Sequence, residues 1–294
     1  MTMVESISSE VSQYFSVLRG ASVEYIALAL VTYYVSVLLY ALRWRLILRG
    51  IGREAPMGEL VKAIMASIFM NNVTPMSRGG GELLRIAWVS RRVNIPAGMS
   101  AVSIVYERIL ETIPVMVLFL VGLTYFSSEP AVPVAIGAAG IALIWIKWDS
   151  FVRVSLRVFR TEATPEELKR ITALRSLHNI NLAAVGLSSA VWVLDVVRLK
   201  LITLAFGLSL SWGLVAVVSV ANLVLGLMAF TPGGIGIIEG GLVGTLIHFG
   251  LPSTLAVSVT LLERLVSYVI SSAVGFLVLL TSGGVEIWRA LRSQ

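Results

Sequence analysis

Long apolar runs separated by short polar stretches follow one another along almost the whole chain. Five of these runs are long enough to cross a membrane as helices, because about 20 apolar residues span a hydrocarbon core. The predicted full spans are residues 21–42, 98–126, 131–148, 180–206 and 254–280. The longest stretch without such a run, residues 149–178, leaves no room for a large soluble domain.

Two further apolar segments are interrupted by proline and glycine in a way that predicts hairpins. Residues 59–73 would form a helix of about 22 Å, which is shorter than a hydrocarbon core of about 30 Å. A break at Thr74-Pro75 and three glycines follows, and then a second short helix at 82–90. Residues 214–230 and 235–249 flank a similar break. Because irregular backbone at membrane depth must face protein or water, each pair predicts a re-entrant hairpin.

The two halves of the chain match each other in order. At an offset of 157 residues the matches are Gly50 with Gly207, Thr74 with Thr231, Pro75 with Pro232, Gly79 with Gly236, Glu82 with Glu239 and, more loosely, Arg43 with Lys200. At an offset of 156 they are Pro96 with Pro252, Glu107 with Glu263 and Arg108 with Arg264. We interpret this as a duplication: repeat one at 21–126, a linking span and cytoplasmic loop at 127–179, and repeat two at 180–281. Three full spans separate the two starts, so repeat two is predicted to be inverted.

The composition agrees with a membrane protein. Of 294 residues, 57% are hydrophobic and 14% charged, and the mean hydropathy is +0.88; soluble proteins average about 45–50% apolar and about 25% charged. These values exclude a soluble globular domain, a disordered chain and a coiled coil. They predict an all-α polytopic membrane protein with an inverted repeat, two re-entrant helical hairpins and about five full transmembrane spans.

The charge and the cysteine and histidine content limit which cofactors and partners are expected. The chain has no cysteine and only two histidines, His178 and His248, so we expect no disulfide and no metal or haem cofactor. The net charge of +6 is interpreted as membrane-flanking anchors, not as a nucleic-acid surface. Basic residues gather at 43–53, at 91–92, in the 149–178 loop and in the C-terminal tail. The positive-inside rule therefore predicts a cell-membrane protein with an external N-terminus and a cytoplasmic C-terminus.

The tip of the first predicted hairpin carries groups that bind anions. Its glycines let backbone N–H groups converge, and a helix that starts near Glu82 directs its positive end to the same place. Arg78 adds a forked donor suited to phosphate. The candidate residues for binding an anionic head group are Asn72, Thr74, Arg78, Gly79, Gly80, Gly81, Glu82 and Arg85. The alternative is structural: Glu82 caps the helix and pairs with Arg78 or with Arg85, which is three residues on and shares its helix face.

The second tip keeps the glutamate but lacks the arginines. Its candidate residues are Gly233, Gly234, Gly236 and Glu239. The GxGxxE string is not interpreted as a dinucleotide site, because no βαβ unit surrounds it. Glu239 is either a protonatable gate or a helix N-terminal carboxylate bound by local N–H groups. Anion binding is therefore expected at the first tip or in a cavity shared by both tips.

Several charged residues lie inside the predicted spans, where charge is costly. The candidate coupling and ion-pair residues are Glu107, Arg108, Asp195, Arg198, Glu263 and Arg264. Neighbours in a helix do not face each other, so Glu107-Arg108 and Glu263-Arg264 need partners elsewhere. The repeat favours Arg108 with Glu82 and Arg264 with Glu239, whereas Asp195 and Arg198 can neutralise each other. A static network that clamps hairpin to span is the alternative. Polar residues at depth are expected to form interhelical hydrogen bonds: Asn71, Asn72 and Asn222.

These motifs resemble a known family. The string Thr74-Pro75…Arg78…Gly81-Glu82…Arg85, with its second-half counterpart from Thr231 to Glu239 and with Glu263-Arg264, resembles the flippase-like family. This family is also called the lysylphosphatidylglycerol synthase transmembrane region. The resemblance covers about residues 20–280. In longer members a soluble aminoacyl transferase domain follows, and the membrane region is implied to flip an aminoacylated phospholipid. This sequence holds no such domain, so the resemblance implies lipid translocation without synthase activity.

The sequence thus predicts a lipid flippase or scramblase and not an enzyme. Its substrate would be an anionic or aminoacylated phospholipid, or a polyprenyl-phosphate-linked lipid, whose head group crosses a polar cavity while Glu82 and Glu239 exchange partners. Membrane lipid is the expected partner, and the oligomeric state is not predicted. Two alternatives remain: a transporter of a small soluble anion and an intramembrane lipid-modifying enzyme. The second lacks an evident nucleophile or metal cluster.

Overall fold

The structure is a computed structural model that describes residues 16–74, 79–126, 131–158, 163–284 and 286–287. Every regular element in this part of the chain is a helix, as predicted. The first half contains α2 (Val23–Gly50), α3 (Met57–Val73), α4 (Gly79–Arg92), α5 (Ala97–Phe126), α6 (Ala131–Ile146), α7 (Trp148–Val158), α8 (Pro165–Ala173) and the short η1 (Leu174–Ser176). The second half contains α9 (His178–Ala205), α10 (Trp212–Met228), η2 (Pro232–Gly234), α11 (Ile237–His248), α12 (Ser253–Arg264), the π-helical η3 (Leu265–Ile270) and α13 (Ser271–Thr281).

Three stretches of the described residues are long and apolar enough to cross a membrane: α2, α9 and the continuous helix Ser253–Thr281. They agree with three of the predicted spans. The predicted spans 98–126 and 131–148 correspond to α5, which carries charged residues, and to α6, which has 16 residues. The first span does not end at residue 42 as predicted, because α2 continues to Gly50. Arg43 was expected to close the span, but it is buried and paired inside the bundle.

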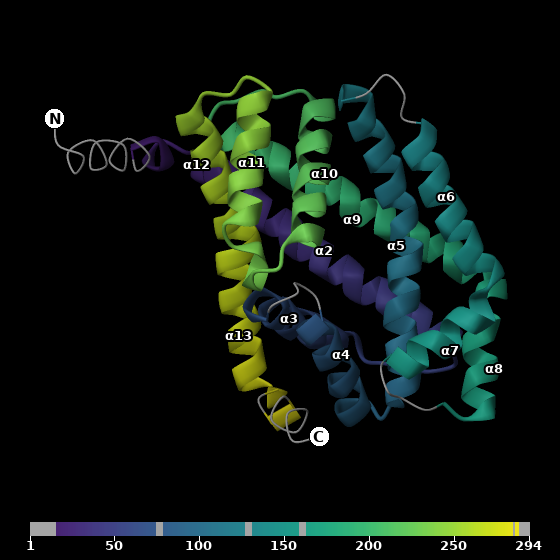
Figure 1. Ribbon diagram of the computed structural model, residues 1–294. Coiled ribbons are helices and arrows are strands. Elements are labelled where there is room, and N and C mark those ends of the chain that lie inside the picture. Colours follow the sequence, from purple (N-terminus) through teal and green to yellow (C-terminus); the bar gives the residue numbers. More distant parts are fainter. Residues whose placement is uncertain (1–15, 75–78, 127–130, 159–162, 285, 288–294) are drawn as a thin grey trace.

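Two pairs of short helices approach each other from opposite ends of the molecule. Helices α3 and α4 pack together in the lower part of Figure 1, and α10 and α11 pack together in the upper part. We call α3–α4 the first hairpin and α10–α11 the second hairpin. Their tips meet: a Cβ added at Gly233 would lie 3.0 Å from the carbonyl oxygen of Asn72. Gly233 also has a φ of 60°, which favours glycine.

The core consists of two hydrophobic clusters, one built mainly from the first half of the chain and one mainly from the second. The first includes Trp44 and Trp88 from α2 and α4, and the second includes Leu199 and Leu242 from α9 and α11. Helices α2 and α9 pack along each other and run obliquely behind the more upright helices (Figure 1). Apolar side chains on the outer face of α2, such as Leu28, are exposed. An exposed apolar surface of this kind suits a helix that faces lipid.

Helix α13 approaches α3 most closely at Gly275. An added Cβ there would lie 2.4 Å from the carbonyl oxygen of Met65 and 2.9 Å from the Cβ of Phe69. Because backbone atoms cannot give way without a shift of the helix, Gly275→Ala is expected to destabilise the protein by about 1–3 kcal/mol. Thermal unfolding in detergent measures this change.

Gly244 in α11 provides the matched control, since a Cβ there meets nothing within 4 Å. Gly244→Ala is expected to leave stability unchanged or to raise it by up to about 1 kcal/mol through helix propensity. Equal losses of stability in the two variants would contradict the close approach of α13 to α3.

Candidate functional site

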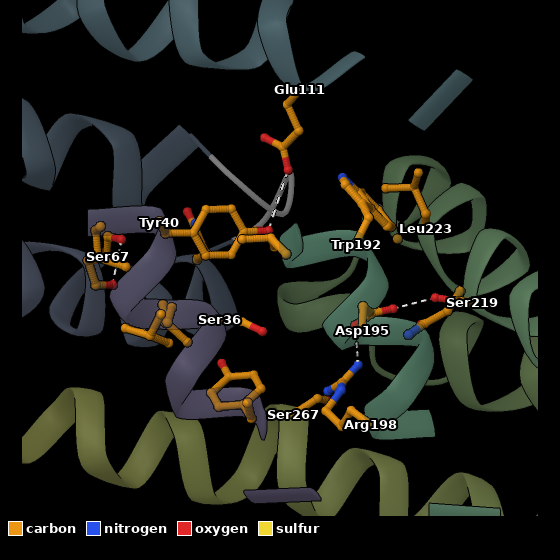
Figure 2. A pocket seen from close by; sticks show the side chains of 18 of the residues that line it. Ser36, Tyr40, Ser67, Glu111, Trp192, Asp195, Arg198, Ser219, Leu223 and Ser267 are labelled. Carbon is orange, nitrogen blue, oxygen red and sulfur yellow. Dashed lines mark hydrogen bonds and ion pairs between the residues drawn. The ribbon is translucent and has the colours of Figure 1, made fainter. Parts of the chain in front are cut away.

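A cavity of about 330 Å³ lies between α2 and α9, and the two hairpins and α5 also contribute to its walls. Figure 2 shows Tyr40 and Glu111 on one side of it and Asp195, Arg198 and Ser219 on the other. Its lining is unusual for a bundle of apolar helices, because four arginines and three carboxylates face it. These are Arg43, Arg85, Arg108, Arg198, Glu111, Asp195 and Glu263.

A second, smaller space of about 220 Å³ lies where the hairpin tips meet. It shares Tyr33, Asn71 and Ser267 with the first cavity, so the two are adjacent. Gly233 and Arg264 also line it. Together the two spaces place the tips beside the charged cavity.

Glu107 of α5 is the centre of the first charged cluster. This fully buried carboxylate accepts hydrogen bonds from Arg43 Nε at 3.2 Å and Arg85 Nη2 at 2.6 Å. Arg43 also donates to Ser188 Oγ of α9 at 2.8 Å, and the Arg85 guanidinium lies 4.0 Å from the centre of the Trp44 ring. Buried charge is tolerated where it is paired and hydrogen-bonded in this way.

Arg108 extends this cluster to the first hairpin. Its Nε donates to Glu82 Oε1 of α4 at 3.0 Å, and its Nη1 donates to Glu111 Oε2 at 2.8 Å. The pairing of Arg108 with Glu82 was predicted from the repeat and is confirmed. The side chain of Arg108 is 34% exposed, whereas those of Arg43 and Arg85 are 1% and 6% exposed. Arg108 is therefore the cation of this cluster with the most access to the cavity.

Arg264 holds the second hairpin to α12. Its Nε donates to Glu239 Oε1 at 2.6 Å, as predicted, and its Nη2 donates to the carbonyl oxygen of Gly233 at 2.8 Å. Glu239 Oε2 also accepts from the backbone N–H of Gly236 at 2.6 Å. The expectation of a helix N-terminal carboxylate bound by a local N–H group is therefore confirmed as well.

The third charged cluster joins α9 to α12. Arg198 Nη2 lies 2.6 Å from Asp195 Oδ1 and 3.3 Å from Glu263 Oε1. The predicted pairing of Asp195 with Arg198 is thus confirmed. Ser219 Oγ of α10 donates to the other oxygen of Asp195 (Figure 2). Among the described residues, no group of three or more His, Cys, Asp or Glu side chains is placed to hold a metal ion.

Comparison with known proteins shows the family of this chain. The family described as Lysylphosphatidylglycerol synthase TM region matches residues 8–275. The chain belongs to this family. It is a multi-pass membrane protein, and no solved structure matches it significantly.

The chain is also similar to several curated membrane proteins. The UPF0104 membrane protein MJ1595 of Methanocaldococcus jannaschii is 24% identical over 90% of this chain and 86% of its own length. PH1989 of Pyrococcus horikoshii is 27% identical over 88% of each chain. A third relative, named glycosyltransferase AglD, from Haloferax volcanii, is 29% identical over 78% of this chain but only 44% of its own length.

The first tip of this family member differs from the prediction in the details of its backbone. Helix α4 begins at Gly79 and not near Glu82. The N–H of Gly81 donates to Asn71 Oδ1 at 2.9 Å, so it is already used within the hairpin. Arg78, with residues 75–77, lies outside the described residues. Thr74 donates to the carbonyl oxygen of Met70 at 2.7 Å, and a Cβ at Gly80 would collide with the Thr74 side chain, so this turn is tightly packed.

The alternative pairing of Glu82 with Arg85 is wrong. Arg85 bonds to Glu107 and Glu82 bonds to Arg108, although the two residues share a face of α4. The reason is that Glu107 and Arg108 are adjacent on α5, so each meets a partner of opposite charge on the hairpin. Asn72 donates to Ser272 Oγ of α13 at 2.7 Å, which is the expected interhelical hydrogen bond.

Some of the predicted site residues line a cavity, and others contact the residues that line it. Those that line a cavity are Arg85, Arg108, Asp195, Arg198, Glu263, Asn72, Gly233, Gly234 and Arg264. Those that support the lining are Glu107, Glu82 and Glu239, which hold its arginines, together with the turn residues Thr74, Gly79, Gly80, Gly81 and Gly236.

Sequence reasoning missed Arg43, Glu111 and Tyr40. The offset of 157 placed Lys200 opposite Arg43, but the contacts relate Arg43 to Arg198 instead. A sequence signal for this exists: Arg-x-(Arg/Lys)-Leu-Ile occurs at residues 43–47 and again at 198–202, at an offset of 155.

Proposed function

We propose that this protein translocates a lipid with an anionic head group between the membrane leaflets, as a flippase or scramblase and not as an enzyme. The observation that carries the proposal is the cavity of about 330 Å³, lined by four arginines and enclosed by apolar helices. Its size falls within the range of about 300–1,000 Å³ for ligand pockets. The head group would enter the cavity while the acyl or prenyl chain stays in lipid.

The membrane architecture that we propose has five full spans, formed by α2, α5, α6, α9 and α12–α13, and two re-entrant hairpins from an inverted duplication. Contacts across α2 and α9 support it. Arg43 of α2 donates to Ser188 of α9, and Arg198 of α9 lies 5.7 Å from the ring centre of Tyr33 of α2. At the offset of 155, Arg43 corresponds to Arg198 and Tyr33 to Ser188. The contact is therefore reciprocal, as a two-fold arrangement of the halves requires.

The substrate class and orientation follow from charge. The family name refers to lysylphosphatidylglycerol, a lipid whose head group contains a phosphate. Arginine suits phosphate because its guanidinium donates two parallel hydrogen bonds. We propose that the phosphate engages Arg108, the most exposed of the first cluster, as Glu82 is displaced. The basic ends of the helices would lie in the cytoplasm, with the N-terminus outside.

Leaflet exchange in liposomes tests this proposal. Purified protein would be reconstituted, and the exchange of fluorescent phosphatidylglycerol and of fluorescent polyprenyl phosphate measured by chemical quenching of the outer leaflet. Arg108→Gln removes a charge-assisted hydrogen bond, which contributes about 1.5–3 kcal/mol. Exchange is therefore expected to slow by about 10- to 100-fold.

Arg91→Ala is the matched control, because Arg91 is an exposed cation on the same hairpin and does not line either cavity. It should exchange lipid at the rate of the unaltered protein. Exchange that is unaffected by Arg108→Gln would refute the proposed site. If neither lipid exchanges but a radiolabelled small anion enters the lumen, the protein is a soluble-anion transporter.

A further inference from the structure

The two halves differ in how they compensate buried carboxylates. In the first half three arginines face three glutamates: Arg43, Arg85 and Arg108 with Glu82, Glu107 and Glu111. In the second half Leu242 stands at the position that matches Arg85, and Ser267 stands at the position that matches Glu111. Glu263, the counterpart of Glu107, has therefore lost one of the two cations that its counterpart contacts.

The remaining cation near Glu263 is shared. Arg198 lies 3.3 Å from Glu263 but 2.6 Å from Asp195, to which it donates a hydrogen bond. Glu263 is 1% exposed, and within the described part of the chain no cation donates a hydrogen bond of regular geometry to its carboxylate; the uncharged hydroxyl of Ser267 is its hydrogen-bonding neighbour. Two carboxylates and one guanidinium carry a net charge of −1 in a buried cluster that lines the cavity.

The groups around Glu263 do not remove this charge. Helix α9 presents Asp195 and Arg198, and α2 presents the uncharged Tyr33, whose ring faces Arg198. Arg264, next to Glu263 in the chain, is bonded to Glu239 of α11. From η3, the uncharged Ser267 faces the same cavity. An uncompensated buried charge is costly, and a proton on either carboxylate removes it.

We infer that Asp195, Arg198 and Glu263 form a proton-binding site that exchanges one proton with the cavity. Asp195, whose side chain is 28% exposed, is the entry point, and Glu263 is the buried member of the pair. Binding a proton raises the charge of the cluster by one and so favours an anion in the same cavity. By reciprocity, an anion in the cavity favours the proton. This consequence for transport rests on the proposed function, whereas proton binding itself does not.

Infrared spectroscopy tests proton binding without any transport measurement. Purified protein in a maltoside detergent, which contains no carbonyl group, would be titrated and the carbonyl stretch of neutral carboxylic acids recorded in H₂O and D₂O. Exposed carboxyl groups are ionised at about pH 7. A deuterium-sensitive band of about one carboxyl group is expected there, and Glu263→Gln should lose it.

Glu239→Gln is the matched control, because Glu239 is a carboxylate on the adjacent helix that already has Arg264 and a backbone N–H as partners. It should retain the band. Circular dichroism and a monodisperse elution profile confirm that each variant is folded. Asp195→Asn gives a second test, because it relieves the excess charge and should also remove the band.

Three results would overturn the inference. The first is the absence of the band from the unaltered protein. The second is a band in both Glu263→Gln and Asp195→Asn that is as large as in the unaltered protein. The third is a band that sodium abolishes at constant pH but choline does not. The last would mark a sodium site. Failure of lipid exchange alone leaves the band unchanged, so the proposed function and the proton site are judged separately.

Discussion

Replacing Glu107 by glutamine is expected to destabilise the protein by about 3–5 kcal/mol, the typical cost of breaking a buried ion pair. Glu107 bonds to both Arg43 and Arg85, which are 1% and 5% exposed. Arg43 would keep Glu111 at 3.4 Å and Ser188, but Arg85 would lose the carboxylate that it contacts at 2.6 Å. The free energy of unfolding in mixed micelles, titrated with a denaturing detergent, measures the loss.

The same change at Glu263 should have a much smaller effect. Glu263→Gln leaves Arg198 bonded to Asp195 and removes a carboxylate to which no cation donates a hydrogen bond of regular geometry. The expected change is within about 1 kcal/mol, because the proton that this site binds already neutralises the charge that the substitution removes. Equal losses of stability in the two variants would refute the asymmetry between the halves.

The ion pairs between hairpins and spans could be predicted because two constraints coincided. Adjacent charges on a helix cannot pair with each other, and the repeat places such an adjacent glutamate and arginine in both halves, each of which needs a partner on another helix. Arg108 with Glu82 and Arg264 with Glu239 followed. Arg43 could not be predicted in this way. A basic residue at the end of an apolar run has the pattern of an interfacial anchor, and only its tertiary contacts with Glu107 and Ser188 show that it is buried.

The sequence also did not predict the π-helical turn η3. The π-helical turn η3, at Leu265–Ile270, lies inside a mostly apolar run that predicts a continuous span. It directly follows Glu263 and Arg264, which point to different partners: Glu263 contacts α9, and Arg264 contacts the second hairpin. Such turns often occur at functional sites. No local pattern of residues marks it, because the requirement arises from helices far away in the sequence.

The mobility of the first hairpin can be tested by linking its tip to α13. Asn72 Nδ2 donates to Ser272 Oγ at 2.7 Å, so thiols at these positions would face each other. Because the chain has no cysteine, Asn72→Cys with Ser272→Cys introduces the only two thiols. If the head group passes when the first tip moves away from the second, fixing the first tip to α13 with a short, reducible bis-thiol reagent should slow lipid exchange at least about tenfold, since the lid-like motion that gates passage is blocked. Reduction should restore the rate.

A link at the base of the same hairpin separates blocked motion from mere crosslinking. Arg92 Nη2, at the end of α4, donates to the carbonyl oxygen of Ser282, which follows α13. Arg92→Cys with Ser282→Cys, linked by a reducible bis-thiol reagent long enough to replace the arginine side chain, therefore joins the hairpin to the end of α13 at the opposite end of the hairpin. A hairpin that pivots about its base should still open, so this link should leave exchange nearly unchanged. If both links leave exchange unchanged, the tips are a fixed structural contact, and the head group must pass along α2 and α9 without hairpin movement.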